Sequence, residues 1–122
     1  MRTPNFRQRA FHDLRTLLYR WSPPMDVVID EPDHYVLVTR HIQKNKKPLS
    51  FGAVRISKTY VSFHFKPMFL NPSLIADISP ALKKRQQGKG CFNFKAPDAR
   101  LFLEIKELVK QGYQDFVRRG YL

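Results

Sequence analysis

Clusters of lysine and arginine are the residues of this 122-residue sequence whose chemistry is easiest to interpret. The chain has 22 Lys and Arg against 10 Asp and Glu, a formal net charge of +12. A surface this positive attracts phosphate-rich or otherwise acidic partners. The densest clusters are at residues 44–47 and 83–89. Smaller ones include Arg2, Arg7 and Arg9 near one end and Arg118 and Arg119 near the other. The alternative interpretation is a solvated surface with no specific ligand.

We therefore predict a binding surface for an anionic partner, either a phosphorylated ligand or nucleic acid. Binding would proceed by charge neutralisation, with ring stacking by Tyr60. The basic candidates are Lys44, Lys46, Lys47, Arg55, Lys58, Lys83, Lys84, Arg85 and Lys89. The polar and aromatic candidates are Tyr60, His64 and Asn93. A partner protein is a further alternative.

Aromatic side chains alternate with this charge, and exposed rings on a sheet can stack nucleic-acid bases. The segment 89–94, KGCFNF, resembles an RNA-recognition strand but departs from it at Cys91 and Asn93. We expect most of the rings to fill a hydrophobic core. They are Phe51, Tyr60, Phe63, Phe65, Phe92 and Phe94.

The single cysteine, Cys91, excludes an intramolecular disulfide and a four-ligand structural zinc site. Its neighbour Lys89 suggests a thiol of lowered pKa, and a small enzyme using Cys91 or His64 is one hypothesis. The alternative is that Cys91 is a small buried residue in a strand.

His41 and His64, with Asp30, Glu31 or Asp33, are a candidate metal site without the usual ligand spacing. We expect no catalytic residue, metal or cofactor.

The hydrophobic pattern predicts the elements that would position these residues. A helix is expected from Thr3-Pro4 to the stop at Ser22-Pro23-Pro24, because proline disrupts helical hydrogen bonding. Strands are predicted over 25–30, 35–42, 51–56, 59–65 and 91–95. In the fourth, Val61, Phe63 and Phe65 share one face, and Tyr60, Ser62 and His64 share the other.

The connections are predicted as turns and short helices. Turns are expected over 43–48 and at Ser57-Lys58, and the segment 67–72 is expected to break the sheet. Short helices are predicted over 73–78 and from Ser79-Pro80 to Gly88. A final helix should begin at Pro97-Asp98. Its apolar stripe is Leu101, Ile105, Leu108, Val109, Gly112 and Phe116.

These elements predict a single α+β domain over residues 1–122. The small, mostly antiparallel sheet has four to five strands, with N- and C-terminal helices packed on one face and short helices between strands. No apolar run is long enough to span a membrane, and no unbroken apolar segment follows the N-terminal arginines. With one cysteine, these features favour a cytoplasmic protein without a membrane partner.

Residues 44–94 carry a family resemblance. The stretches FGAVRI, YVSFH and KKRQQGKGCFNF are similar to the YdhG-like family of small bacterial domains of unknown function. The likeness covers about the last two-thirds of the chain and implies a cytosolic α+β domain with a small sheet and flanking helices. The family offers no established catalytic residues to transfer.

Some members of that wider family are labelled frataxin-like iron chaperones, which implies iron binding as an alternative function. Frataxins typically present an acidic helix and sheet edge to iron. The first predicted helix here has only Asp13 as an acid, and its basic residues are Arg7, Arg9, Arg15 and Arg20. Hard cations prefer clustered oxygen ligands, so the iron role is not carried over.

Overall fold

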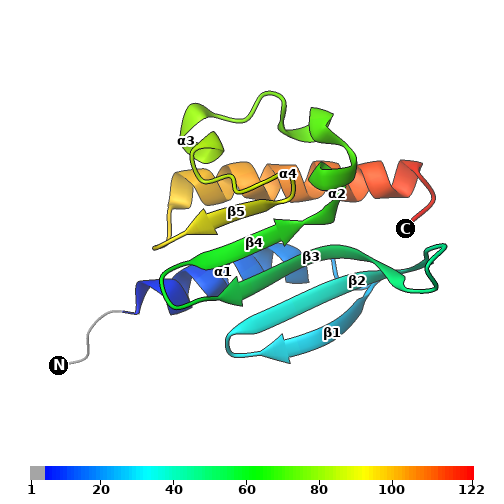
Figure 1. Ribbon diagram of the computed structural model, residues 1–122, viewed down its shortest axis with the longest axis horizontal. Coiled ribbons are helices and arrows are strands. Elements are labelled where there is room, and N and C mark those ends of the chain that lie inside the picture. The colour runs from blue at the N-terminus through cyan, green and yellow to red at the C-terminus, as the bar shows by residue number, and fades with distance from the viewer. Residues whose placement is uncertain (1–4) are drawn as a thin grey trace.

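A five-stranded antiparallel sheet forms the centre of the molecule in the computed structural model, which describes residues 5–122 (Figure 1). Its strands follow one another in chain order, so each pairs with the next. They are β1 (Asp26–Glu31), β2 (His34–Ile42), β3 (Pro48–Ile56), β4 (Val61–Phe65) and β5 (Cys91–Phe94). The connections that join β1 to β2, β2 to β3 and β3 to β4 are short, so consecutive strands can pair only as antiparallel hairpins. This explains the meander. The predicted α+β fold is confirmed.

Two helices cover one face of this sheet. In Figure 1, α1 (Phe6–Tyr19) and α4 (Ala99–Arg118) both lie behind the strands. The α1 helix begins after Asn5, whose side chain accepts a hydrogen bond from the Gln8 amide, and it ends before the predicted proline stop. The predicted start at Thr3-Pro4, like Arg2, lies outside the described residues. The α4 helix begins after Asp98, as predicted, and that side chain accepts from the Leu101 amide.

The core lies between the sheet and these two helices. One row of paired residues runs across four strands, from Tyr35 through Val54 and Phe63 to Phe92, and all four are fully buried. The six residues of the predicted α4 stripe are buried as well. Of the six aromatic residues expected in the core, only Tyr60 is exposed.

The segment between β4 and β5 differs from the prediction in two ways. The sheet is broken at residues 67–72 as expected, but the break begins with a helix that was not predicted, α2 (Lys66–Leu70), which follows β4 directly and precedes η1 (Pro72–Ile75). The helix that begins after Ser79, α3 (Pro80–Lys83), ends at Lys83 instead of Gly88. Residues 85–87 leave the helix because they pair with β5.

This pairing adds a short stretch of backbone to the outer edge of β5. The Asn93 amide donates to the Arg85 carbonyl at 2.8 Å, and the Gln87 amide donates to the Cys91 carbonyl at 2.8 Å. Gly88, with φ of +69°, makes the turn between the two segments. The competing sheet hydrogen bonds therefore set the end of α3.

Two further boundaries were predicted wrongly. The third strand starts at Pro48 instead of residue 51, because its first residues pair with the end of β2. The link between β3 and β4 covers residues 57–60 instead of Ser57-Lys58 alone.

Polar contacts attach the end of α4 to the short helices. Asp115 is only 4% exposed, and its side chain accepts from Asn71 Nδ2 at 3.1 Å and from Arg119 Nε at 2.8 Å. Near the start of α4, Glu104 accepts hydrogen bonds from the amide and hydroxyl of Ser79. These contacts hold the connection from β4 to β5 at the edge of the sheet.

None of the helices described here combines the length and apolarity that crossing a bilayer requires.

Candidate anion-binding face

The sheet face opposite α1 and α4 faces the viewer in Figure 1. Strand pairing places His34, Arg55, Ser62 and Asn93 in one row on this face. The next row is formed by Val36, Ala53, His64 and Cys91. We call the side of the sheet that carries these eight residues the open face. Because side chains alternate along a strand, these residues point away from the buried row.

A shallow hollow of about 650 Å³ occupies the end of the open face where β3 turns into β4. It is lined by Arg55, Ile56, Ser57, Lys58, Tyr60, Ser62 and His64. Four predicted site residues therefore meet here: Arg55, Lys58, Tyr60 and His64. Ser62, which is 6% exposed, donates through Oγ to the Arg55 carbonyl at 3.4 Å.

The turn that forms one wall of this hollow is held by α1. Nη1 of Arg7 donates to the Ser57 carbonyl at 2.7 Å and also to the carbonyl of Lys58. The basic character of Arg7 was noted in the sequence, but its partner, 50 residues away, was not predicted. Its contact positions the turn that carries Lys58 and Tyr60.

A second hollow, of about 290 Å³, lies at the other end of β4. Its lining consists of Ser50, His64, Phe65, Lys66, Phe69, Gly90 and Cys91. Nζ of Lys66 lies 4.5 Å from the centre of the Phe69 ring, a cation–π contact, and Phe69 is 47% exposed. His64 belongs to both linings, so the two hollows adjoin along β4.

Arg85 and Asn93, both predicted site residues, extend the first row to the edge of the sheet. Their backbones are joined by the Asn93–Arg85 hydrogen bond described above, which gives Arg85 the register position beside Asn93. The row therefore begins at His34 on β2, continues through Arg55 and ends at Arg85.

The electrostatic environment of His64 disfavours its protonated form. Burial lowers the pKa of this imidazole below its usual value, and the neighbouring His34 and Arg55 lower it further. His64 is therefore neutral at pH 7 and can accept or donate a hydrogen bond without adding charge.

Cys91 lies opposite His64 in the register, at the meeting point of the two hollows. Burial raises the pKa of the Cys91 thiol, which contradicts the hypothesis of a lowered pKa. Its Sγ atom is 3.5 Å from Asn93 Oδ1. A raised pKa makes this thiol less ready to form the thiolate that a cysteine nucleophile uses.

The proposed metal ligands do not come together. His41 packs against Tyr121, with ring centres 4.6 Å apart, and Asp30 forms a forked ion pair with Arg15 at 3.0 Å. Within residues 5–122 there is no group of three or more His, Cys, Asp or Glu side chains that could hold a metal ion.

The two densest lysine clusters lie outside both hollows. The turn between β2 and β3 contains Lys44, Lys46 and Lys47, and it is at the opposite end of β3 from Arg55. Lys83 ends α3, Lys84 follows it, and Lys89 precedes β5.

Three residues on or beside the open face were not predicted from the sequence: His34, Lys66 and Phe69. The alternation that identified His64 extends to His34 on β2, but no comparable signal marks the five-residue helix α2.

Comparisons with protein-family models, curated proteins and solved structures find no match for this chain. The resemblance to the YdhG-like family therefore stays a prediction from the sequence motifs.

Proposed function

We propose that this protein is a non-catalytic binding module for an anionic partner that carries phosphate groups, held across the open face. The main support is the composition of the two hollows. Their linings contain Arg55, Lys58 and Lys66 and no carboxylate. An anion entering either hollow would therefore meet positive charge without a competing acid.

The donors around these hollows suit phosphate oxygens. The planar guanidinium of Arg55 offers paired N–H groups that match two phosphate oxygens, and the lysines add mobile positive charges. The Asn93 amide and His64 supply neutral hydrogen bonds between the charges. No step of bond making or breaking is needed for this role.

The arrangement favours an extended anion over a compact one. Ser62 lies in β4 and Lys66 follows the last residue of that strand, so the two are about 13 Å apart, which is more than one phosphate group covers. Tyr60 and Phe69, 36% and 47% exposed, lie in the opposite hollows and can stack bases. Within the anionic class, single-stranded nucleic acid is the ligand these features support best.

Salt dependence tests this proposal. For a strand that contacts four phosphates, log affinity should fall with a slope of about −2.8 against log salt, or about 50-fold between ~50 and ~200 mM. Fluorescence anisotropy with a labelled oligothymidylate of about ten nucleotides measures this slope. An affinity that does not change with salt would overturn the proposal. Equal competition by a nucleoside triphosphate would instead favour a small phosphorylated ligand.

Binding should also depend on pH through His64. Since burial, His34 and Arg55 keep its pKa low in the free protein, a bound phosphate should raise that pKa, and the complex should take up a proton. Affinity for a phosphodiester strand is therefore expected to rise, by at most about tenfold per pH unit, as pH falls from about 7.5 to 5.5.

Two variants assign this pH effect. In His64→Gln, affinity should no longer change with pH. In His34→Gln, a change in the same row as Arg55, affinity should still depend on pH. The profile is measured by anisotropy at fixed salt. An unchanged pH dependence in His64→Gln would exclude His64 as the responsible group.

A further inference from the structure

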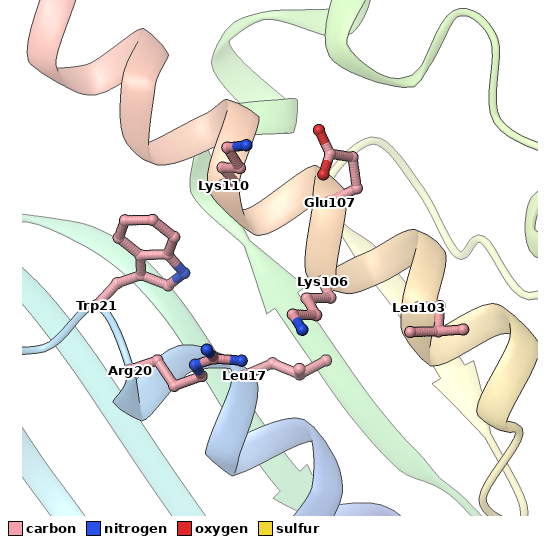
Figure 2. A pocket seen from close by; sticks show the side chains of 7 residues that line it. All are labelled: Leu17, Arg20, Trp21, Leu103, Lys106, Glu107 and Lys110. Carbon is pink, nitrogen blue, oxygen red and sulfur yellow. The ribbon is translucent and has the colours of Figure 1, made fainter.

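A groove between the end of α1 and the middle of α4 lies on the helical side of the molecule, away from the open face (Figure 2). Its volume is about 540 Å³, within the usual range for small-molecule sites. The lining residues are Leu17, Arg20, Trp21, Leu103, Lys106, Glu107 and Lys110.

Positive charges face each other across this groove. Figure 2 shows the guanidinium of Arg20, which follows the last residue of α1, and the ammonium of Lys106 on α4 directed toward one another. Among the described residues, no carboxylate lies within 4.0 Å of Arg20, Lys106 or Lys110. The Glu107 carboxylate points away from Arg20 and Lys106. Two like charges without a counter-ion repel each other, and an anion between them would remove that repulsion.

The rest of the groove is apolar. Trp21 packs against Tyr113, with ring centres 4.6 Å apart, which fixes its indole on one wall. In Figure 2 the indole nitrogen points toward the groove. Leu103, 65% exposed, forms the opposite wall, and Leu17 lies between Arg20 and Leu103. An apolar body could cover these side chains while the charges hold an acidic group.

We propose that this groove binds a small amphipathic organic anion. Its acidic group would lie between Arg20 and Lys106, and its flat or alkyl body would contact Trp21, Leu17 and Leu103. This site is separate from the open face, so it does not depend on the function proposed there. This chemical class follows because the groove has positive charges without a counter-ion beside an apolar wall.

The probe 1-anilinonaphthalene-8-sulfonate has this chemistry, and N-phenyl-1-naphthylamine is a comparable aromatic body without the sulfonate. Trp21 is the only tryptophan in the chain, so quenching of its fluorescence reports binding in the groove. We expect the anionic probe to quench Trp21 and to bind at least about tenfold more tightly than the neutral probe.

Charge-reversal variants then test the assigned residues. Lys106→Glu should weaken binding of the anionic probe at least about tenfold and leave the neutral probe nearly unchanged. Lys44→Glu, in the distant β2–β3 turn, changes the net charge equally and should keep wild-type affinity for both probes. Both positions are exposed, so thermal melting should show folded proteins.

Three results would overturn the proposal. The first is no quenching of Trp21 by the anionic probe. The second is equal affinity for the two probes, which would mean that the groove recognises apolar surface only. The third is an equal loss in Lys106→Glu and Lys44→Glu, which would attribute the effect to net charge.

Discussion

Replacing Arg55 and Arg85 together with alanine is expected to weaken binding of a single-stranded oligonucleotide about 100-fold. Each charge-assisted hydrogen bond to phosphate contributes about 1.5–3 kcal/mol, so each loss should cost about tenfold or more. Both arginines belong to the row on the open face that continues through Ser62 and Asn93. The salt slope should also decrease by about 1.4, which corresponds to two phosphate contacts on a single strand.

The matched control removes two charges from the other end of β3. Lys44→Ala with Lys47→Ala lowers the net charge by the same amount in an exposed turn. We expect this variant to bind within about threefold of the wild-type protein, because distant exposed charges are screened at physiological salt. Equal losses in both double variants would show that net charge, and not the open face, determines affinity.

The second large effect is on stability, at Gly112 in the middle of α4. A Cβ added there would lie 2.4 Å from Cζ of Phe65 and 2.8 Å from Cβ of Pro67. Phe65 is fully buried and packed edge-on against Phe51 at 5.2 Å, so its ring has no free space to move into. Gly112→Ala should therefore push α4 away from the sheet and lower the free energy of unfolding by about 3 kcal/mol.

Chemical denaturation and thermal melting measure this loss, and the expected decrease in Tm is about 10 °C or more. Helix propensity alone predicts the opposite sign, a gain of about 1 kcal/mol for alanine over glycine. A stabilised Gly112→Ala variant would therefore contradict the close approach of α4 to β4. Gln114→Ala, an exposed change on the same helix, should alter stability by less than about 0.5 kcal/mol. Adding Phe65→Leu to Gly112→Ala should recover part of the loss.

The sequence predicted the parts of the fold and site that depend on local periodicity. Alternation over residues 61–65 placed Val61, Phe63 and Phe65, which fill the core, on the opposite face of the strand from Ser62 and His64. A short link after Ile56 was enough to bring the ends of β3 and β4 together. This is why Arg55, Lys58, Tyr60 and His64, chosen from the sequence, line one hollow.

Other features depend on contacts between distant parts of the chain. The extent of α3 could not be predicted, because the backbone hydrogen bonds that join Arg85 and Gln87 to Asn93 and Cys91 of β5 end the helix before Gly88. The sequence left open whether the lysine clusters converge in space, and strand direction places residues 44–47 at the opposite end of β3 from Arg55. The groove at Trp21 is formed by packing against Tyr113, more than 90 residues away, and no local pattern marks it.

The most direct test of the proposed function is to map where a single-stranded oligonucleotide contacts the protein. Amide chemical shifts are recorded by NMR while the oligothymidylate is added. We expect the largest changes on the open face, at Arg55, Ser62, His64 and Asn93, with smaller changes on α1 and α4. Changes concentrated in the turn at residues 44–47 or along α4, with the open face unaffected, would contradict the account.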